Sequence, residues 1–205
     1  MQLDPSILSH ADNYKLLTNL VVPRPIAWVS TQSTDGVVNL APFSFFNVVG
    51  SNPPYIIISI SENEGQPKDT ARNILDSGAF VVNLVTEDLF DAMNISAADF
   101  PPEQSELEAG KLHTSPSVRI PVPRVAEAQA SLECKLHSVQ QLGANTLFIG
   151  EVVMFHVADQ LMGPRLHINN FAPIGRLGSP SFYCRTTDRV DLARVSYAQW
   201  SSEQS

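Results

Sequence analysis

The sequence predicts a mainly β protein, a closed or split β-barrel with few helices, from three observations. Short runs rich in Val, Ile and aromatic residues recur along the chain and are bounded by turn-forming residues. Only one pronounced helical pattern occurs, so the regular strand–helix alternation of a parallel α/β sheet is missing. The last two apolar runs are long and alternate with polar residues, which is typical of antiparallel strands with one solvated face.

Six predicted strands follow one another, and turn signals separate them. Asp35-Gly36 predicts a hairpin between the first two, and residues 141–145 predict another between the last two. The strands are expected at Ile26–Thr31, Val37–Leu40, Tyr55–Ser61, Phe80–Val85, Ala128–Leu142 and Thr146–Ala158. In the fifth strand, the alternation places Ala130, Leu132, Cys134 and Leu136 on one face, directed either inward or outward.

Three helices are expected, and the first is the most regular. It spans Lys68–Ser77, with Gly78 where helices often end in a left-handed residue and with Asp69 or Thr70 as its N-cap. The other two are expected at Leu89–Ala97 and Glu103–Ala109.

Two segments do not fit the strand and helix pattern. Residues 101–123 carry five prolines and predict a long surface excursion, of the kind that often has a function or forms a dimer arm. The tail at about 188–205 has no assigned role, although Tyr197 and Trp200 are candidates for packing on a partner subunit. Because composition never shifts enough to mark a linker, we expect one domain over residues 1–205.

Composition narrows the classes of function. The net charge of −8 argues against a nucleic-acid partner, because neutralising phosphates requires clustered Lys and Arg. No run reaches the roughly 18 apolar residues that span a membrane, and no signal peptide is visible. We therefore expect a cytoplasmic protein with no membrane partner, in which Cys134 and Cys184 are reduced thiols. The histidines lack metal-ligand spacing, so no metal site is expected, and hydrolase, Rossmann and phosphate-loop motifs are absent.

The segment Gly65–Asn73 is a candidate anion site. It opens the first predicted helix, whose unpaired N–H groups and positive dipole end attract anions. Lys68 adds a charge, Thr70 adds a hydroxyl donor, and Arg72 follows one turn later. The alternative is that Asp69 or Thr70 only caps the helix and that Lys68 is solvated.

The segment Asn39–Ser44 is a candidate site for a flat ligand. Because Pro42 has no N–H, the strand ladder is expected to break there and to leave neighbouring backbone groups free. Phe43, Phe45 and Phe46 can wall an apolar slot, although the alternative is that they belong to the core. Serine and threonine hydroxyls at the ends of strands usually form hydrogen bonds with the backbone of turns. Taken together, however, the apolar slot, these hydroxyls and the anion site suit a ligand that has both an aromatic ring system and a phosphate.

Four motifs in order resemble the flavin reductase-like, FMN-binding split-barrel family. They read RPIAWVST, NLAPFSFFNVV, KDTARNI and GAFVVNLV, and weaker matches continue to FIGEVVMFHV and PIGRLGSPSFYCRT. The resemblance implies a six-stranded Greek-key barrel, a homodimer, and noncovalent FMN near the dimer interface. Its implied cofactor-binding residues are Ser30, Thr31, Asn39, Ala41, Pro42, Phe43, Ser44, Ser59, Ser61, Lys68, Asp69 and Thr70.

The resemblance also implies an activity, which is hydride transfer from NADH or NADPH to bound FMN and from there to a second acceptor. The flavin carries this chemistry, so no catalytic side chain is assigned. His167 and Arg176 are candidates for the open face of the site, or else a surface His and a salt-bridging Arg. One departure from the family pattern is that two carboxylates, Glu62 and Glu64, precede the KDT motif beside the expected phosphate.

Three alternatives to this activity stay open. A pyridoxamine-phosphate-oxidase-like enzyme would use the same barrel, but we expect it to carry more than the 13 Lys and Arg residues present. A non-catalytic flavin-binding carrier, sensor or electron shuttle would use the same pocket, and NAD(P)H oxidation separates it from a reductase. A purely structural barrel would give a colourless protein.

Overall fold

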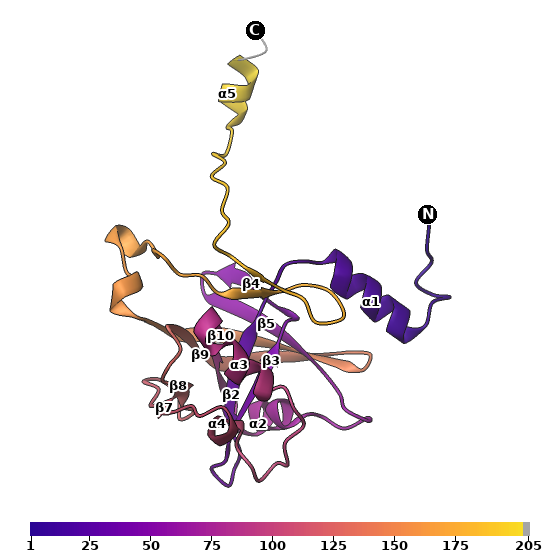
Figure 1. The fold of residues 1–205 in the computed structure, drawn as a ribbon, viewed down its shortest axis with the longest axis vertical. Coiled ribbons are helices and arrows are strands. Elements are labelled where there is room, and N and C mark those ends of the chain that lie inside the picture. The colour runs from indigo at the N-terminus through magenta and orange to yellow at the C-terminus, as the bar shows by residue number, and fades with distance from the viewer. Residues whose placement is uncertain (203–205) are drawn as a thin grey trace.

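A seven-stranded antiparallel sheet forms the body of the protein, in the strand order β3-β2-β6-β9-β10-β5-β4 (Figure 1). The computed structural model describes residues 1–202, so residues 203–205 of the predicted tail lie outside the described part. The strands are β2 (Ala27–Gln32), β3 (Val38–Phe43), β4 (Phe46–Ser51), β5 (Pro54–Ser61), β6 (Ala79–Asn83), β9 (Ala130–Leu142) and β10 (Asn145–Val157). The predicted mainly β fold with few helices is confirmed.

The sheet curls, so that its two edge strands, β3 and β4, are joined by a short connection in the chain. β3 and β4 lie at opposite ends of the strand order, yet only Ser44 and Phe45 separate them in the chain. The backbone N–H of Ser59 in β5 donates to the carbonyl of Phe45 at 2.8 Å, which closes this corner. The result is a barrel that is split where β3 and β4 diverge.

Two smaller sheets and short helices cover the barrel. One sheet joins β1 (Arg24–Pro25), β11 (Ile174–Arg176) and β12 (Tyr183–Arg185), and the other joins β7 (Thr114–Ser115) and β8 (Arg124–Val125). The α-helices are α1 (His10–Leu20), α2 (Asp69–Ser77), α3 (Phe90–Ile95), α4 (Glu106–Ala109) and α5 (Tyr197–Ser202). Three 3₁₀ turns complete the described chain, at η1 (Glu87–Leu89), η2 (Asp159–Leu161) and η3 (Pro164–Leu166).

The ends of α2 differ in how well the sequence predicts them. Gly78 ends the helix in the left-handed region at φ 66°, as expected, and its N–H donates to the carbonyl of Ile74. The capping prediction at the other end is wrong. Lys68 is the N-cap residue and makes no side-chain cap, while Asp69 and Thr70 lie inside the first turn. The first N–H groups of this helix are therefore left without a side-chain acceptor.

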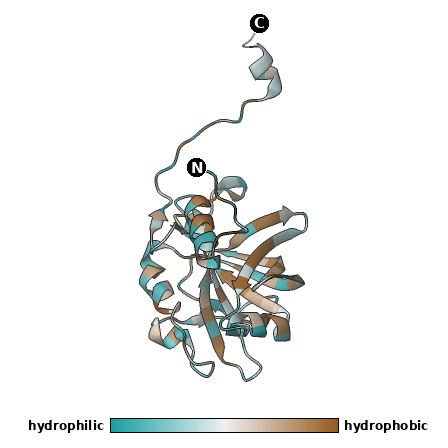
Figure 2. Cartoon of the chain, turned by 90° about the vertical axis from the view of Figure 1, so that its right-hand side faces the viewer, coloured by the Kyte–Doolittle hydropathy of each residue, from teal (hydrophilic) through white to brown (hydrophobic). Residues whose placement is uncertain are grey.

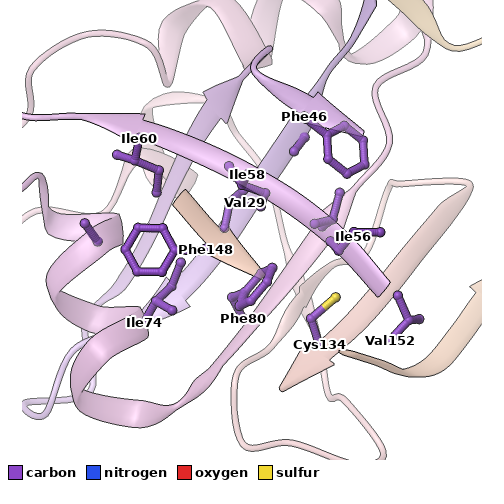
Figure 3. Close-up of a cluster of buried hydrophobic side chains, with 13 residues drawn as sticks. Val29, Phe46, Ile56, Ile58, Ile60, Ile74, Phe80, Cys134, Phe148 and Val152 are labelled. Atoms are coloured by element: carbon purple, nitrogen blue, oxygen red, sulfur yellow. The ribbon is translucent and has the colours of Figure 1, made fainter. Parts of the chain in front are cut away.

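The barrel interior is filled by aliphatic and aromatic side chains from every wall (Figure 3). Ile58 in β5, Ile74 in α2, Phe80 in β6 and Phe148 in β10 are all fully buried there. Cys134 also points into this cluster, so the inward alternative for its face of β9 is the one observed. The apolar stretches of the strands stand out in Figure 2, where they alternate with polar loops.

One glycine is required by this packing. A Cβ on Gly150 in β10 would lie 2.5 Å from Cζ of Phe80, which is closer than two carbon atoms can approach. Any side chain at this position would therefore displace the Phe80 ring from the core.

A second apolar cluster lies outside the barrel wall, beneath α3. It contains Trp28, Leu40, Met93 and Ile174, and the indole N–H of Trp28 donates to Ser96 Oγ at 2.8 Å. This cluster fixes the segment after α3 against β2 and β3. Within residues 1–202, no helix combines the length and the apolar character needed to cross a bilayer.

Candidate functional site

A cavity of about 300 Å³ opens where the N-terminus of α2 meets β3. The end of β3 forms one wall, the loop before α2 forms a second, and residues 96–106 close the third. From the sequence-predicted site, this cavity brings together Asn39, Ala41, Pro42, Phe43, Lys68, Asp69 and Thr70. Seven of the twelve predicted residues thus line one space, although they come from two segments of the chain.

A second cavity of about 170 Å³ continues from the first and shares Pro42, Phe43 and Ala97 with it. The rest of its lining comes from Ile26, Ser44, Met93, Arg176 and Tyr183. The guanidinium carbon of Arg176 lies 4.4 Å from the centroid of the Tyr183 ring, a cation–π contact that fixes the arginine in place.

Of the two residues expected at the open face of the site, Arg176 lies at a cavity and His167 does not. Arg176 lines the second cavity, and it makes no ion pair within the described part of the chain. His167 is exposed and lines neither cavity. The position of Arg176 depends on a pairing between β11 and β12 that the sequence did not predict.

Lys68 and Arg72 are the basic residues that line the first cavity, and the acidic residue between them in the sequence, Asp69, is already paired. Asp69 accepts an ion-paired hydrogen bond from Arg72, whose Nη1 also donates to the carbonyl of Pro67 at 2.8 Å. Lys68 has no ion-pair partner within residues 1–202, and α2 starts without a side-chain cap. A free ammonium group and unpaired N–H groups at the start of a helix are a donor set that suits a phosphate.

A buried network connects β3, α2 and α4 along the cavity wall. In the amide orientation that satisfies both neighbours, Asn39 accepts from Thr70 Oγ1 at 2.9 Å and donates to Glu106 Oε1 at 3.3 Å. Glu106 Oε2 accepts from the N–H of Leu40 at 2.8 Å. Burial raises the pKa of Glu106, and this effect exceeds the opposing effect of the backbone hydrogen bonds.

Glu106 is a site residue that the sequence did not reveal. It lies in the proline-rich excursion, which the hydrogen bond from Ser105 Oγ to the carbonyl of Val38 attaches to β3. Pro102 from the same excursion also lines the cavity. The excursion thus forms one wall of the cavity, and its functional role stays a prediction.

The aromatic residues after Pro42 divide between three environments. Phe43 lines both cavities, Phe46 belongs to the barrel core, and Phe45 packs against Tyr14 of α1 with ring centroids 6.3 Å apart. The expected break in the ladder at Pro42 is wrong, because β3 continues through Phe43 and pairs Pro42 with Trp28. An edge strand tolerates this proline, since the missing N–H is not needed by a second neighbour.

The other predicted hydroxyls lie outside the cavity. Ser30 is buried and donates to the carbonyl of Pro123, and Thr31 is buried and accepts from Asn73 Nδ2. Ser59 accepts from Asn145 Nδ2, and Ser61 is exposed at the end of β5. Three of these side chains bond to the protein and Ser61 is exposed, so their part in cofactor binding stays a prediction.

The carboxylates before the KDT motif do not reach the anion end. Asn63 and Gln66 line the cavity, whereas Glu62 and Glu64 do not. Glu62 instead accepts a hydrogen bond from Gln141. The two carboxylates of the acidic loop therefore do not add negative charge to the cavity lining. Residues 1–202 contain no group of three or more His, Cys, Asp or Glu side chains placed to hold a metal ion.

Comparisons with known proteins agree on one family. A model described as "Flavin reductase like domain" matches residues 19–174. A protein from Halalkalibacterium halodurans is 47% identical over 207 residues, which cover 97% of this chain and 99% of that protein.

Solved structures are similar over nearly the whole chain. Nitrilotriacetate monooxygenase component B from Bacillus cereus has a TM-score of 0.90 at 40% identity, covering 94% of this chain and 98% of that chain. The 2-nitrobenzoate 2-nitroreductase from Pseudomonas fluorescens has a TM-score of 0.88 at 36% identity, covering 96% and 98%. A putative flavin reductase with a split barrel domain from Shewanella frigidimarina, 23% identical with a TM-score of 0.78 and covering 96% and 99%, has the same fold.

Proposed function

The chain belongs to the flavin reductase-like domain family, and from this membership we propose that it is an FMN-dependent NAD(P)H oxidoreductase. One observation carries the proposal. The uncapped start of α2, with Lys68 and Thr70, lies at one end of a cavity whose other end is walled by Pro42 and Phe43. A phosphate donor set that continues into an apolar slot matches the two chemically different ends of FMN.

The residues present fit FMN on chemical grounds. Lys68 supplies a positive charge, and the N–H groups at the start of α2 supply hydrogen-bond donors for a phosphate. Pro42, Phe43 and Ala97 present apolar surface in the region that both cavities share, where a planar ring would lie. Arg176 supplies a cation in the lining of the second cavity, held by its contact with Tyr183. A cation near the ring would stabilise the negative charge that a flavin gains on reduction.

Bound FMN would supply the redox chemistry, taking a hydride from NADH or NADPH and passing electrons to a second acceptor. The chain's own residues bind and orient it. Asn39, which donates to Glu106, holds the Thr70 hydroxyl in the first turn of α2, and Phe43 would lie against the flavin ring. The segment 96–102 forms the outer wall, so its side chains would contact whatever acceptor enters.

We also propose that the protein acts in the cytoplasm as a homodimer with FMN near the subunit interface. Family membership supports the dimer, and the exposed apolar surfaces of the described chain give it a physical basis.

Steady-state oxidation of NADH and NADPH tests the activity. Protein with added FMN is expected to oxidise at least one of the two nucleotides many times faster than FMN alone. The Lys68→Ala/Thr70→Ala variant is expected to need a higher FMN concentration for the same rate. A protein that binds FMN but oxidises neither nucleotide would instead be a carrier, sensor or electron shuttle.

A further inference from the structure

The C-terminal arm, residues 188–202, carries large apolar side chains that the rest of its own chain does not cover. Val190 and Leu192 are each 89% exposed, and Tyr197 and Trp200 in α5 are 79% and 52% exposed. The arm rises away from the barrel, so nothing else in the chain lies beside it (Figures 1 and 2). Helix α5 has only six residues, too few to be stable in water without packing against another surface.

The root of the arm is firmly attached. Arg189 Nη2 donates to the carbonyl of Phe171 at 2.5 Å, and its Nε donates to the carbonyl of Thr186 at 3.1 Å. Thr186 Oγ1 in turn donates to the carbonyl of Pro173 at 2.8 Å. Beyond Arg189, residues 190–195 make no hydrogen bond within the described chain. Residues 190–195 therefore extend away from the barrel from a fixed starting point at Arg189.

An apolar groove on the barrel is uncovered as well. Its volume is about 420 Å³, and it lies between the small sheet of β1 and β11 and the strands β4 and β9. Its apolar lining includes Pro23, Phe46, Val48, Leu84, Leu132 and Pro173. β4 is an edge strand of the large sheet, and Val48 and Val49 on it are exposed. An uncovered edge with an apolar groove beside it is typical of a protein interface.

We propose that the arm of one copy docks into this groove on a second copy, and that the second copy returns the same contact. The inference rests on the homodimer proposed above and specifies how that dimer forms. A reciprocal exchange buries both uncovered surfaces and closes after two copies, whereas a one-way contact would continue into a filament.

Two further observations favour a second copy over another occupant. The arm and the groove lie on the same chain and are both apolar, so two copies satisfy each other without a third component. The similarity to the Halalkalibacterium halodurans protein spans 97% of this chain, which leaves too few residues outside it to exclude the arm. The arm is thus shared with a relative and is not an unrelated extension.

Light scattering during gel filtration of the full chain, followed by iodide quenching of tryptophan fluorescence, tests the proposal. Trp28 is fully buried, so quenching reports mainly on Trp200. The wild type is expected to have the mass of two chains and a shielded Trp200. Leu192→Asp and Val48→Asp should each raise the dimer dissociation constant at least tenfold and expose Trp200. Leu192→Met, which keeps an apolar side chain, should behave as the wild type.

Three results would overturn the proposal: a monomeric wild type with an exposed Trp200, a monomeric wild type with a shielded Trp200, or a dimer that both aspartate variants leave intact. Because residues 48 and 192 are exposed, the aspartate variants are expected to fold, and circular dichroism checks this. FMN titration of the same variants separates the two proposals. A monomer that still binds FMN would leave the cofactor assignment standing, while a dimer that cannot bind FMN would contradict only that assignment.

Discussion

The side-chain amide of Asn39 lies 2.9 Å from Thr70 Oγ1, and this contact joins the edge strand β3 to the first turn of α2. The two residues are 31 positions apart in the sequence, and both line the first cavity. Glu106 completes the network from a third segment. The position of the Thr70 hydroxyl therefore depends on the barrel and on the proline-rich excursion as well as on its own helix.

Removing the donors at the start of α2 should weaken FMN binding. For the Lys68→Ala/Thr70→Ala variant we expect the FMN dissociation constant to rise roughly 10- to 100-fold, because a hydrogen bond from Lys68 to a charged group contributes about 1.5–3 kcal/mol and the loss of the Thr70 hydroxyl releases Asn39 from the first turn of α2. Quenching of FMN fluorescence in a titration measures it. Lys135→Ala is the matched control, since Lys135 is exposed on β9 and lines neither site cavity. Equal affinities for all three proteins would refute the phosphate assignment.

The Glu106 carboxyl should make stability depend on pH in a defined direction. Its pKa is raised by burial, so between the ordinary glutamate pKa and the raised value the folded state binds more protons than the unfolded state. The contribution of the Glu106 carboxyl to the free energy of unfolding therefore falls as pH rises through that window. Glu106→Gln removes it and keeps a carbonyl that can accept from Leu40.

Urea unfolding at a series of pH values tests this sign. The stability of Glu106→Gln relative to the wild type should increase as pH rises above the ordinary glutamate pKa. Glu108→Gln, an exposed neighbour on the same short helix, should show no such trend. A constant difference between Glu106→Gln and the wild type across the whole range would contradict the buried-carboxyl account.

The buried carboxylate of Glu133 should make stability depend on pH in the opposite direction. Burial alone would raise the pKa of Glu133, but hydrogen bonds from His156 and from the N–H groups of Val118 and Arg119 outweigh it and lower the pKa. Its stabilisation is present above the unfolded-state pKa and is lost as pH falls through the folded-state pKa.

Glu133→Gln should therefore cost about 3 kcal/mol at neutral pH, since it leaves buried donors without an ionised acceptor. Chemical denaturation should show this cost shrinking as the solution is made more acidic than the ordinary glutamate pKa. Glu103→Gln, at an exposed position, serves as the control. A cost that stayed the same in acid would mean that ionisation of Glu133 is unimportant.

Two neighbouring phenylalanines should separate binding from stability. Phe46 is a core residue, and Phe46→Ala should reduce the free energy of unfolding by about 3–5 kcal/mol. Phe43 lines both cavities and is only partly buried, so Phe43→Ala should raise the FMN dissociation constant with a smaller loss of stability. Thermal melts and FMN titrations of both variants measure the two effects. If Phe43→Ala lost mainly stability while its FMN dissociation constant stayed that of the wild type, Phe43 would not be part of the slot.

The central strands and α2 were predictable because their apolar periodicity and turn residues are local signals. Gly78 and the paired runs around Gly143 needed no information from the rest of the chain. β4 escaped prediction because its side chains after Phe46 are mostly exposed, so it lacks a buried face. α1 escaped for the same reason, since Thr18 is its only buried residue.

The site was predictable only where consecutive residues form it. Pro42, Phe43, Lys68 and Thr70 come from two short motifs, and they line one cavity as expected. Ser30 looks equally suitable in sequence, but the partners that bury it, Asn83 and Pro123, come from distant segments. Glu106 and Arg176 reach the site through tertiary contacts of the excursion and of β11, which no local pattern encodes.

FMN binding and its reduction by a nicotinamide nucleotide are measured together in the visible absorption spectrum of the purified protein mixed with FMN, followed by anaerobic addition of NADH and then NADPH. We expect a perturbed flavin spectrum that bleaches rapidly with one or both nucleotides and that reverts when oxygen is admitted. A protein that takes up no FMN, and whose mixture bleaches no faster than free FMN, would contradict this expectation.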